Sequence, residues 1–152
     1  DGRRHDGAGF AALYHPLMRQ VDFQDIPRVR ALLSSAGRAE RRLGVATGSE
    51  GLVICVDDSG ESHWFLRGKP DLPAAAVDVA GRIWASGAGC IFLREPGSDA
   101  FDAVWQDPAW VTPIVSLFAD VGLVIAMGAD GGIVEGRRVS GPDAVMSTER
   151  VT

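Results

Sequence analysis

Residues 123–134 read Leu-Val-Ile-Ala-Met-Gly-Ala-Asp-Gly-Gly-Ile-Val, two apolar runs that are separated by a short turn rich in glycine. This pattern predicts a β-hairpin, because glycine accepts the positive φ that a tight turn requires. The same order of an apolar residue, alanine, any residue, glycine and a short tip occurs in residues 45–53 and 84–91. The glycines that mark the three copies, Gly48, Gly87 and Gly128, are 39 and 41 residues apart. The chain is therefore expected to be a repeat protein in which a Cβ at these glycines is poorly tolerated, through positive-φ strain or disruption of the hairpin.

A period of about 40 residues with several short strands in each repeat is typical of a β-propeller blade. We predict an all-β protein with about three four-stranded blades, in repeats 26–70, 71–110 and 111–152. Each repeat has a proline near its entry, Pro27, Pro73 or Pro113, where it removes no ladder hydrogen bond. The predicted strands are 26–33, 42–47, 52–57 and 61–66; then 74–79, 82–86, 90–94 and 101–105; then 114–118, 123–127, 132–136 and 144–148.

The N-terminal part of the chain allows alternatives. Residues 1–25 are expected to form a tail, with residues 10–23 as a possible outer strand of a preceding blade. An amphipathic helix also fits the spacing of 10–23, although the His15-Pro16 step argues against an uninterrupted one. A helix over 25–37 is the alternative for the first strand of the first repeat, since Leu32 and Leu33 are good helix formers.

Composition excludes several classes of protein. A chain of 152 residues with 46% hydrophobic residues and a net charge of -5 is expected to be one globular domain without nucleic-acid or membrane partners. The densest basic cluster, Arg38, Arg41 and Arg42, is interpreted as a solvated turn rather than a phosphate site. No apolar run approaches about 18 residues and no secretion signal opens the chain, so a cytoplasmic location is slightly favoured. Because the chain begins at Asp1, we expect processing or a longer parent chain.

Few residues have the types and spacing that chemistry requires. Cys55 and Cys90 are too few for a disulfide scaffold or a zinc cage, so they are interpreted as buried packing residues, with a disulfide between them as the alternative. His5, His15 and His63 are expected at a chain end or on outer strands rather than in a nucleophilic device. We expect no metal, no cofactor and no catalytic residue.

The hairpin and the following turn, Asp58-Ser59-Gly60-Glu61-Ser62 with Trp64 just after it, resemble the BNR or Asp-box class of β-propeller repeats. The photosystem II assembly-factor-like propellers are the most similar of these. The chain departs from the motif because Val56 replaces a Ser or Thr and His63 is an extra residue. The resemblance implies a structural turn whose aspartate is not a catalyst. Sialidase-like relatives require a tyrosine nucleophile, and the single tyrosine, Tyr14, precedes the repeats.

The resemblance also implies a binding face, formed by the loops after the second and the fourth strand of each blade. We expect a non-catalytic module for protein–protein interaction or assembly; the alternative is a lectin formed by oligomerisation. Trp84 is expected in the core, and Trp64 and Trp105 over the third turn of their own repeats; the loop residue Trp110 either packs or acts as a stacking anchor. The candidate binding residues are Glu50, Arg67, Lys69, Asp71, Asp107, Trp110 and Asp130.

Three repeats are too few to close a propeller ring. Closed propellers have about four to eight blades, so three repeats leave apolar sheet faces without a neighbour. We therefore expect either a head-to-tail homodimer with six blades or further blades in a longer parent chain.

Overall fold

The computed structural model describes residues 31–120, 122–138 and 146–150, which form an all-β protein. In this part of the chain, helix is limited to the single 3-10 turns Ala39–Arg41 and Ser49–Gly51, so no helix is long enough to cross a membrane. The strands are β1 Leu32–Arg38, β2 Leu43–Gly48, β3 Leu52–Asp57, β4 Gly60–Phe65, β5 Ala74–Val77, β6 Ile83–Gly87, β7 Cys90–Arg94, β8 Asp102–Gln106, β9 Ile114–Asp120, β10 Leu123–Gly128, β11 Ile133–Arg138 and β12 Met146–Arg150.

The strands form three antiparallel sheets, β1-β2-β3-β4, β5-β6-β7-β8 and β9-β10-β11-β12, each a simple meander in chain order. The prediction of an all-β chain is confirmed. Most predicted strands begin and end within two residues of the observed ones, and Pro73 and Pro113 directly precede β5 and β9.

The prediction for the first strand was wrong. Instead of ending at residue 33, β1 continues to Arg38, and Gly37 pairs with Gly44 of β2. The turn follows at Ala39–Arg41, where Arg42 takes a left-handed φ of 49°. The helix predicted as an alternative over 25–37 is also wrong for residues 32–37. The predictions for residues 1–25, including the outer strand over 10–23, lie outside the described residues.

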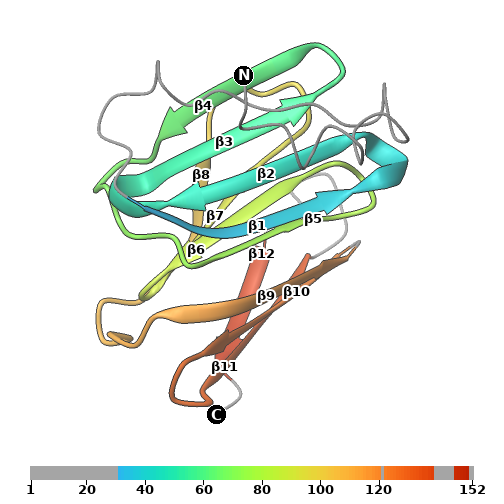
Figure 1. Ribbon diagram of the computed structural model, residues 1–152. Helices are drawn as coiled ribbons and strands as arrows, with labels where there is room; N and C mark the ends of the chain where they lie inside the picture. Colours follow the sequence, from blue (N-terminus) through green and yellow to red (C-terminus); the bar gives the residue numbers. More distant parts are fainter. Residues whose placement is uncertain (1–30, 121, 139–145, 151–152) are drawn as a thin grey trace, which may run out of the picture.

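The second sheet lies between the first and the third (Figure 1). Strand β5 packs against β1 and β2, and β9 packs in turn against β5 and β6. Alternate residues of the second sheet enter two different cores because side chains alternate between the faces of a sheet. In β6, Ile83 and Ala85 enter the core shared with the first sheet, whereas Trp84 enters the core shared with the third.

The tryptophans show how the sheets are joined. Trp84 is 1% exposed, which confirms its predicted core position. The predictions for Trp64 and Trp105 were wrong, because both rings pack between sheets rather than over their own turns. The Trp64 ring lies edge-on to Phe101, which directly precedes β8, and its Nε1 donates a hydrogen bond of 3.0 Å to the Asp99 carbonyl oxygen.

Candidate functional site

The turns after β2, β6 and β10 and the two connections between sheets lie at one end of the strands, because every strand is antiparallel to its neighbour. We call this the loop-bearing end, and it comprises residues 48–51, 66–73, 88–89, 107–113 and 129–132. It contains every candidate binding residue predicted from the sequence. The turns at the opposite end follow β1, β3, β5, β7 and β9.

Backbone hydrogen bonds hold each turn against a connection. In the first sheet, Gly51 N donates to the Pro70 carbonyl oxygen at 2.6 Å and Leu72 N donates to the Gly48 carbonyl oxygen at 3.1 Å. In the other two sheets, the corresponding bonds run from Asp107 N to Gly89 O (2.8 Å) and from Ala129 N to Pro113 O (2.9 Å). The connections are therefore parts of a hydrogen-bonded layer rather than independent loops.

The marker glycines bring this layer together by close approach. Gly48, Gly87 and Gly128 are the last residues of β2, β6 and β10. A Cβ at Gly87 would lie 2.6 Å from the Asp71 carbonyl oxygen, and a Cβ at Gly128 would lie 2.9 Å from the Trp110 ring. None of the three glycines has a positive φ, so the prediction that a Cβ there would cause positive-φ strain was wrong. Glycine is required here because neighbouring loops pack directly on the backbone.

The acidic candidate residues are used to fix the loops. Asp71, Asp107 and Asp130 each accept a backbone N–H from a nearby turn, as Asp side chains commonly do in tight turns. Asp130 also accepts a hydrogen bond of 3.2 Å from the Thr112 hydroxyl. The three backbone bonds are Glu50 N to Asp71 Oδ1 (3.2 Å), Ala109 N to Asp107 Oδ1 (3.0 Å) and Gly132 N to Asp130 Oδ1 (2.9 Å).

The basic candidate residues differ from the acidic ones. Arg67 and Lys69 are exposed residues on the turn after β4. Lys69 has a left-handed φ of 50°, and its N–H donates to the Leu66 carbonyl oxygen at 3.0 Å, so the backbone that carries both side chains is fixed. Two solvated cations on a rigid turn are available to an anionic group of a partner.

Trp110 is a packing residue in the structure. Its side chain is buried, lies edge-on to Trp105 with 5.7 Å between ring centroids, and donates from Nε1 to the Thr112 carbonyl oxygen at 2.7 Å. Trp110 was predicted either to pack or to act as a stacking anchor, and its buried position agrees with packing. The ring closes the end of the core between the second and third sheets.

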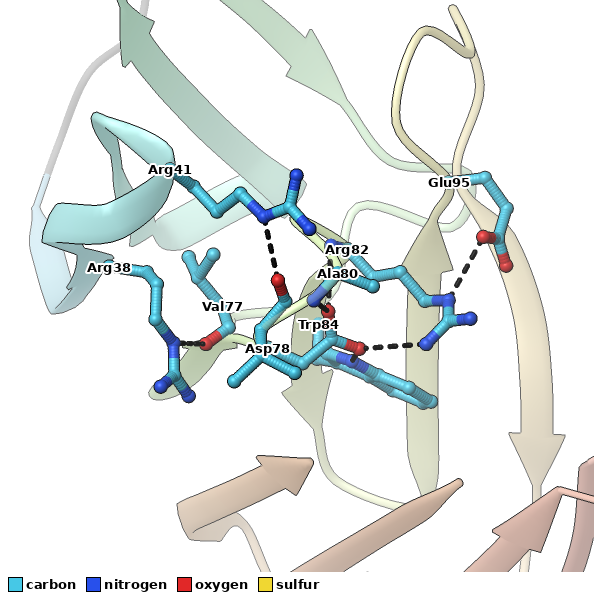
Figure 2. Close-up of polar contacts among 9 residues, drawn as sticks. Arg38, Arg41, Val77, Asp78, Ala80, Arg82, Trp84 and Glu95 are labelled. Atoms are coloured by element: carbon cyan, nitrogen blue, oxygen red, sulfur yellow. Dashed lines mark hydrogen bonds and ion pairs between the residues drawn. The ribbon is translucent and has the colours of Figure 1, made fainter. Parts of the chain in front are cut away.

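A buried polar network occupies the opposite end of the second sheet (Figure 2). The Asp78 carboxylate is fully buried, and four donors satisfy it: Ala80 N and Arg82 N at Oδ1 (3.0 and 2.9 Å), and Arg82 Nη1 and Trp84 Nε1 at Oδ2 (3.1 and 3.2 Å). Arg82 also donates from Nε to Glu95 Oε1 at 3.0 Å. Burial alone would lower the pKa of Arg82, but the bonds to Glu95 and Asp78 raise it above its usual value.

The first sheet is tied to the same turn. Arg38 and Arg41 donate from Nε to the carbonyl oxygens of Val77 and Val79, at 3.2 and 2.6 Å (Figure 2). This network was not predicted from the sequence, since residue 78 was expected inside a strand. The available signal was Asp-x-x-Gly-Arg in residues 78–82, a turn pattern with opposite charges four residues apart. A buried, fully satisfied ion pair of this kind has a structural role.

The turn that resembles an Asp box uses a different aspartate from the one expected. Asp57 Oδ1 accepts hydrogen bonds from Ser59 Oγ (2.6 Å) and Ser59 N (2.9 Å), whereas Asp58 forms an exposed ion pair with Arg42 at 3.4 Å. The hydrogen bond from the Ser59 hydroxyl is the main reason that the pKa of Asp57 lies below its usual value. The turn stabilises its own backbone.

The two thiols are free and buried in the core between the first and second sheets. Burial raises the pKa of both Cys55 and Cys90, so both remain protonated at neutral pH. Among the described residues, no group of three or more His, Cys, Asp and Glu side chains is arranged to hold a metal ion. Comparison of the chain with protein-family models and with curated proteins found no match.

Proposed function

We propose that this chain is a propeller-type repeat protein and acts as a non-catalytic module for protein–protein interaction through its loop-bearing end. The observation that carries the proposal is the continuous layer formed by five loops from three successive sheets. Loops on a rigid scaffold are the usual place for recognition residues. The three meanders, each packed on the next, are the arrangement that successive propeller blades have.

Arg67 and Lys69 are the residues in this layer that we assign to partner contact. Both side chains are exposed, and their turn is fixed by backbone hydrogen bonds. The carboxylates of Asp71, Asp107 and Asp130 are engaged with the backbone, so substituting them would alter the loops as well as any contact. We infer that the partner presents an acidic segment to this basic turn.

A lectin is the alternative function. Sugar-binding sites stack a pyranose face on an exposed aromatic ring. Phe65 and Phe118 are exposed, but none of the four tryptophans, all in the described part of the chain, is. This favours the protein-binding proposal, and a glycan array is the direct test of the alternative.

The test is affinity capture from an extract of the source cells, with the chain as bait. The variant Arg67→Glu/Lys69→Glu is expected to reduce recovery of the partner at least about tenfold, because charge reversal opposes an acidic surface. Arg42→Glu, at the opposite end, is the matched control and is expected to retain capture, since Arg42 is exposed and forms only a surface ion pair with Asp58. Equal recovery by all three baits, or binding on the glycan array alone, would contradict the proposal.

A further inference from the structure

Equivalent residues of the three sheets differ in whether a neighbouring sheet covers them. Counting back from the marker glycine, Val45, Trp84 and Ile125 occupy the same place in β2, β6 and β10. Val45 and Trp84 are buried under the next sheet, at 4% and 1% exposed, whereas Ile125 is half-buried. One residue before the glycine, Thr47 and Ser86 are fully buried, but Met127 is 44% exposed.

The same contrast is present in the first strand of each sheet. Strand pairing places Ala36 opposite Val45, Ala76 opposite Trp84 and Phe118 opposite Ile125. Ala76 is 8% exposed, and Phe118 is 56% exposed. The face of the third sheet that bears Phe118, Ile125 and Met127 is therefore the one that a further sheet would cover. We call it the outgoing face.

The complementary surface lies on β1. In the two interfaces of the structure, the first strand of one sheet packs on the first two strands of the sheet before it. The residues of β5 and β9 that face the preceding sheet are Ala75 and Val77, and Leu117 and Ala119. Strand pairing makes Ser35 and Gly37 their equivalents in β1.

Strand β1 is available for such a contact. Ser35 and Gly37 are exposed, and Leu33 beside them is 44% exposed. Ser35 and Gly37 are small where the outgoing face is bulky. In the interface between the second and third sheets, the sizes of the two sides also compensate, because Trp84 packs in the same core as Ala119 and Ala126.

We propose that a second copy of this chain covers the outgoing face with its β1 and β2, head to tail, so that two chains form a twofold ring of six sheets. Each copy contributes one outgoing face and one β1 surface, so the contact is heterologous and occurs twice in the closed dimer. Six sheets lie within the range of about four to eight that closed propellers use. The corresponding residues of the third strand differ: Cys90 and Phe92 of β7 lie in the core with the preceding sheet, whereas Leu52 and Ile54, their equivalents on β3, are already buried in the single chain. We therefore assign the contact to β1 and β2. This inference rests on the proposed propeller arrangement.

The test is the mass of the full chain in solution, measured by sedimentation. The expected particle has twice the 16.1 kDa mass of one chain. Phe118→Glu and Ser35→Arg are each expected to raise the dimer dissociation constant by at least about a hundredfold, because each places a charge in an apolar contact. Both sites are exposed in the single chain, so both variants are expected to fold, and circular dichroism checks this. Val111→Glu, at a loop residue that is 79% exposed, is the control and is expected to remain a dimer.

The double variant Ser35→Arg/Phe118→Glu distinguishes the modes of association. In a head-to-tail dimer, the glutamate of one copy meets the arginine of the other at both contacts, so dimerisation is expected to recover. A wild-type monomer, a growing filament, or a dimer that Ser35→Arg leaves intact would each overturn the proposal. The outcome is independent of partner capture. A wild-type chain that is a monomer but captures the partner contradicts this inference alone, and a wild-type dimer that captures no partner contradicts the proposed function alone.

Discussion

The second sheet is covered on both faces, whereas the equivalent face of the third sheet is partly exposed. Trp84 of β6 and Ile125 of β10 occupy corresponding positions, and one is buried while the other is half-buried. Both strands pair antiparallel with the strands on either side and end at a marker glycine. The comparison shows that an apolar repeat pattern specifies the strand and its register, but that a neighbouring sheet decides whether its side chains enter a core.

The largest expected effect comes from truncating these two positions. Trp84→Ala is expected to lower the free energy of unfolding by about 3 to 5 kcal/mol, because it leaves a large cavity in a packed core. Ile125→Ala is expected to lower it by about 1 kcal/mol when measured on the monomer, since the side chain is only half-buried. Urea denaturation at low protein concentration measures both. Equal losses at the two positions would remove the distinction between the sheets.

A second comparison concerns ion pairs on the same two sheets. Asp78→Ala is expected to lower the free energy of unfolding by about 3 kcal/mol, because it leaves the buried donors of Arg82 and Trp84 without their acceptor. Arg137→Ala removes the pair with Glu135 on the outgoing face of the third sheet, where the arginine side chain is 68% exposed in the single chain. On the monomer, this variant is expected to change the free energy of unfolding by less than about 1 kcal/mol. Thermal unfolding of the two variants gives the measurement. A loss for Asp78→Ala as small as that for Arg137→Ala would show that the network is dispensable.

The marker glycines give a smaller effect with a defined order. Valine at Gly48, Gly87 or Gly128 is expected to lower the free energy of unfolding by about 1 to 3 kcal/mol. The loss should be larger at Gly87 than at Gly128, because the new Cβ meets a backbone oxygen in the first case and side-chain atoms in the second. Gly44→Val, measured on the monomer, provides the control, since a Cβ there has nothing within 4 Å in the single chain. Unchanged melting temperatures for all three marker positions would mean that the repeats are misaligned.

The sequence was sufficient for most strands because each repeat contains a hairpin with its own glycines and an entry proline. It was not sufficient for β1, since Ser34 to Gly37 have turn composition, and only pairing with β2 extends the strand through them. The loop-bearing end followed from the meander order, whereas the burial of Trp110 and the bond from Glu50 N to Asp71 depend on contacts between repeats. Asp78 was missed because residues 74–79 were expected to form one strand, whereas β5 ends at Val77 and donors within residues 80–84 bond the Asp78 carboxylate.

The difference in cover between corresponding positions on the second and third sheets underlies both the stacking and the proposed dimer. Its most direct test is the rate at which a thiol reagent modifies the variants Ser86→Cys and Met127→Cys at neutral pH. The wild-type thiols, Cys55 and Cys90, are buried and protonated, so they supply a low background. In dilute solution, the thiol introduced at position 127 is expected to react at least about a hundredfold faster than the one at position 86. At concentrations that favour the proposed dimer, position 127 should become protected as well. Equal rates at the two positions in dilute solution would contradict the stacking of the second sheet between the first and the third.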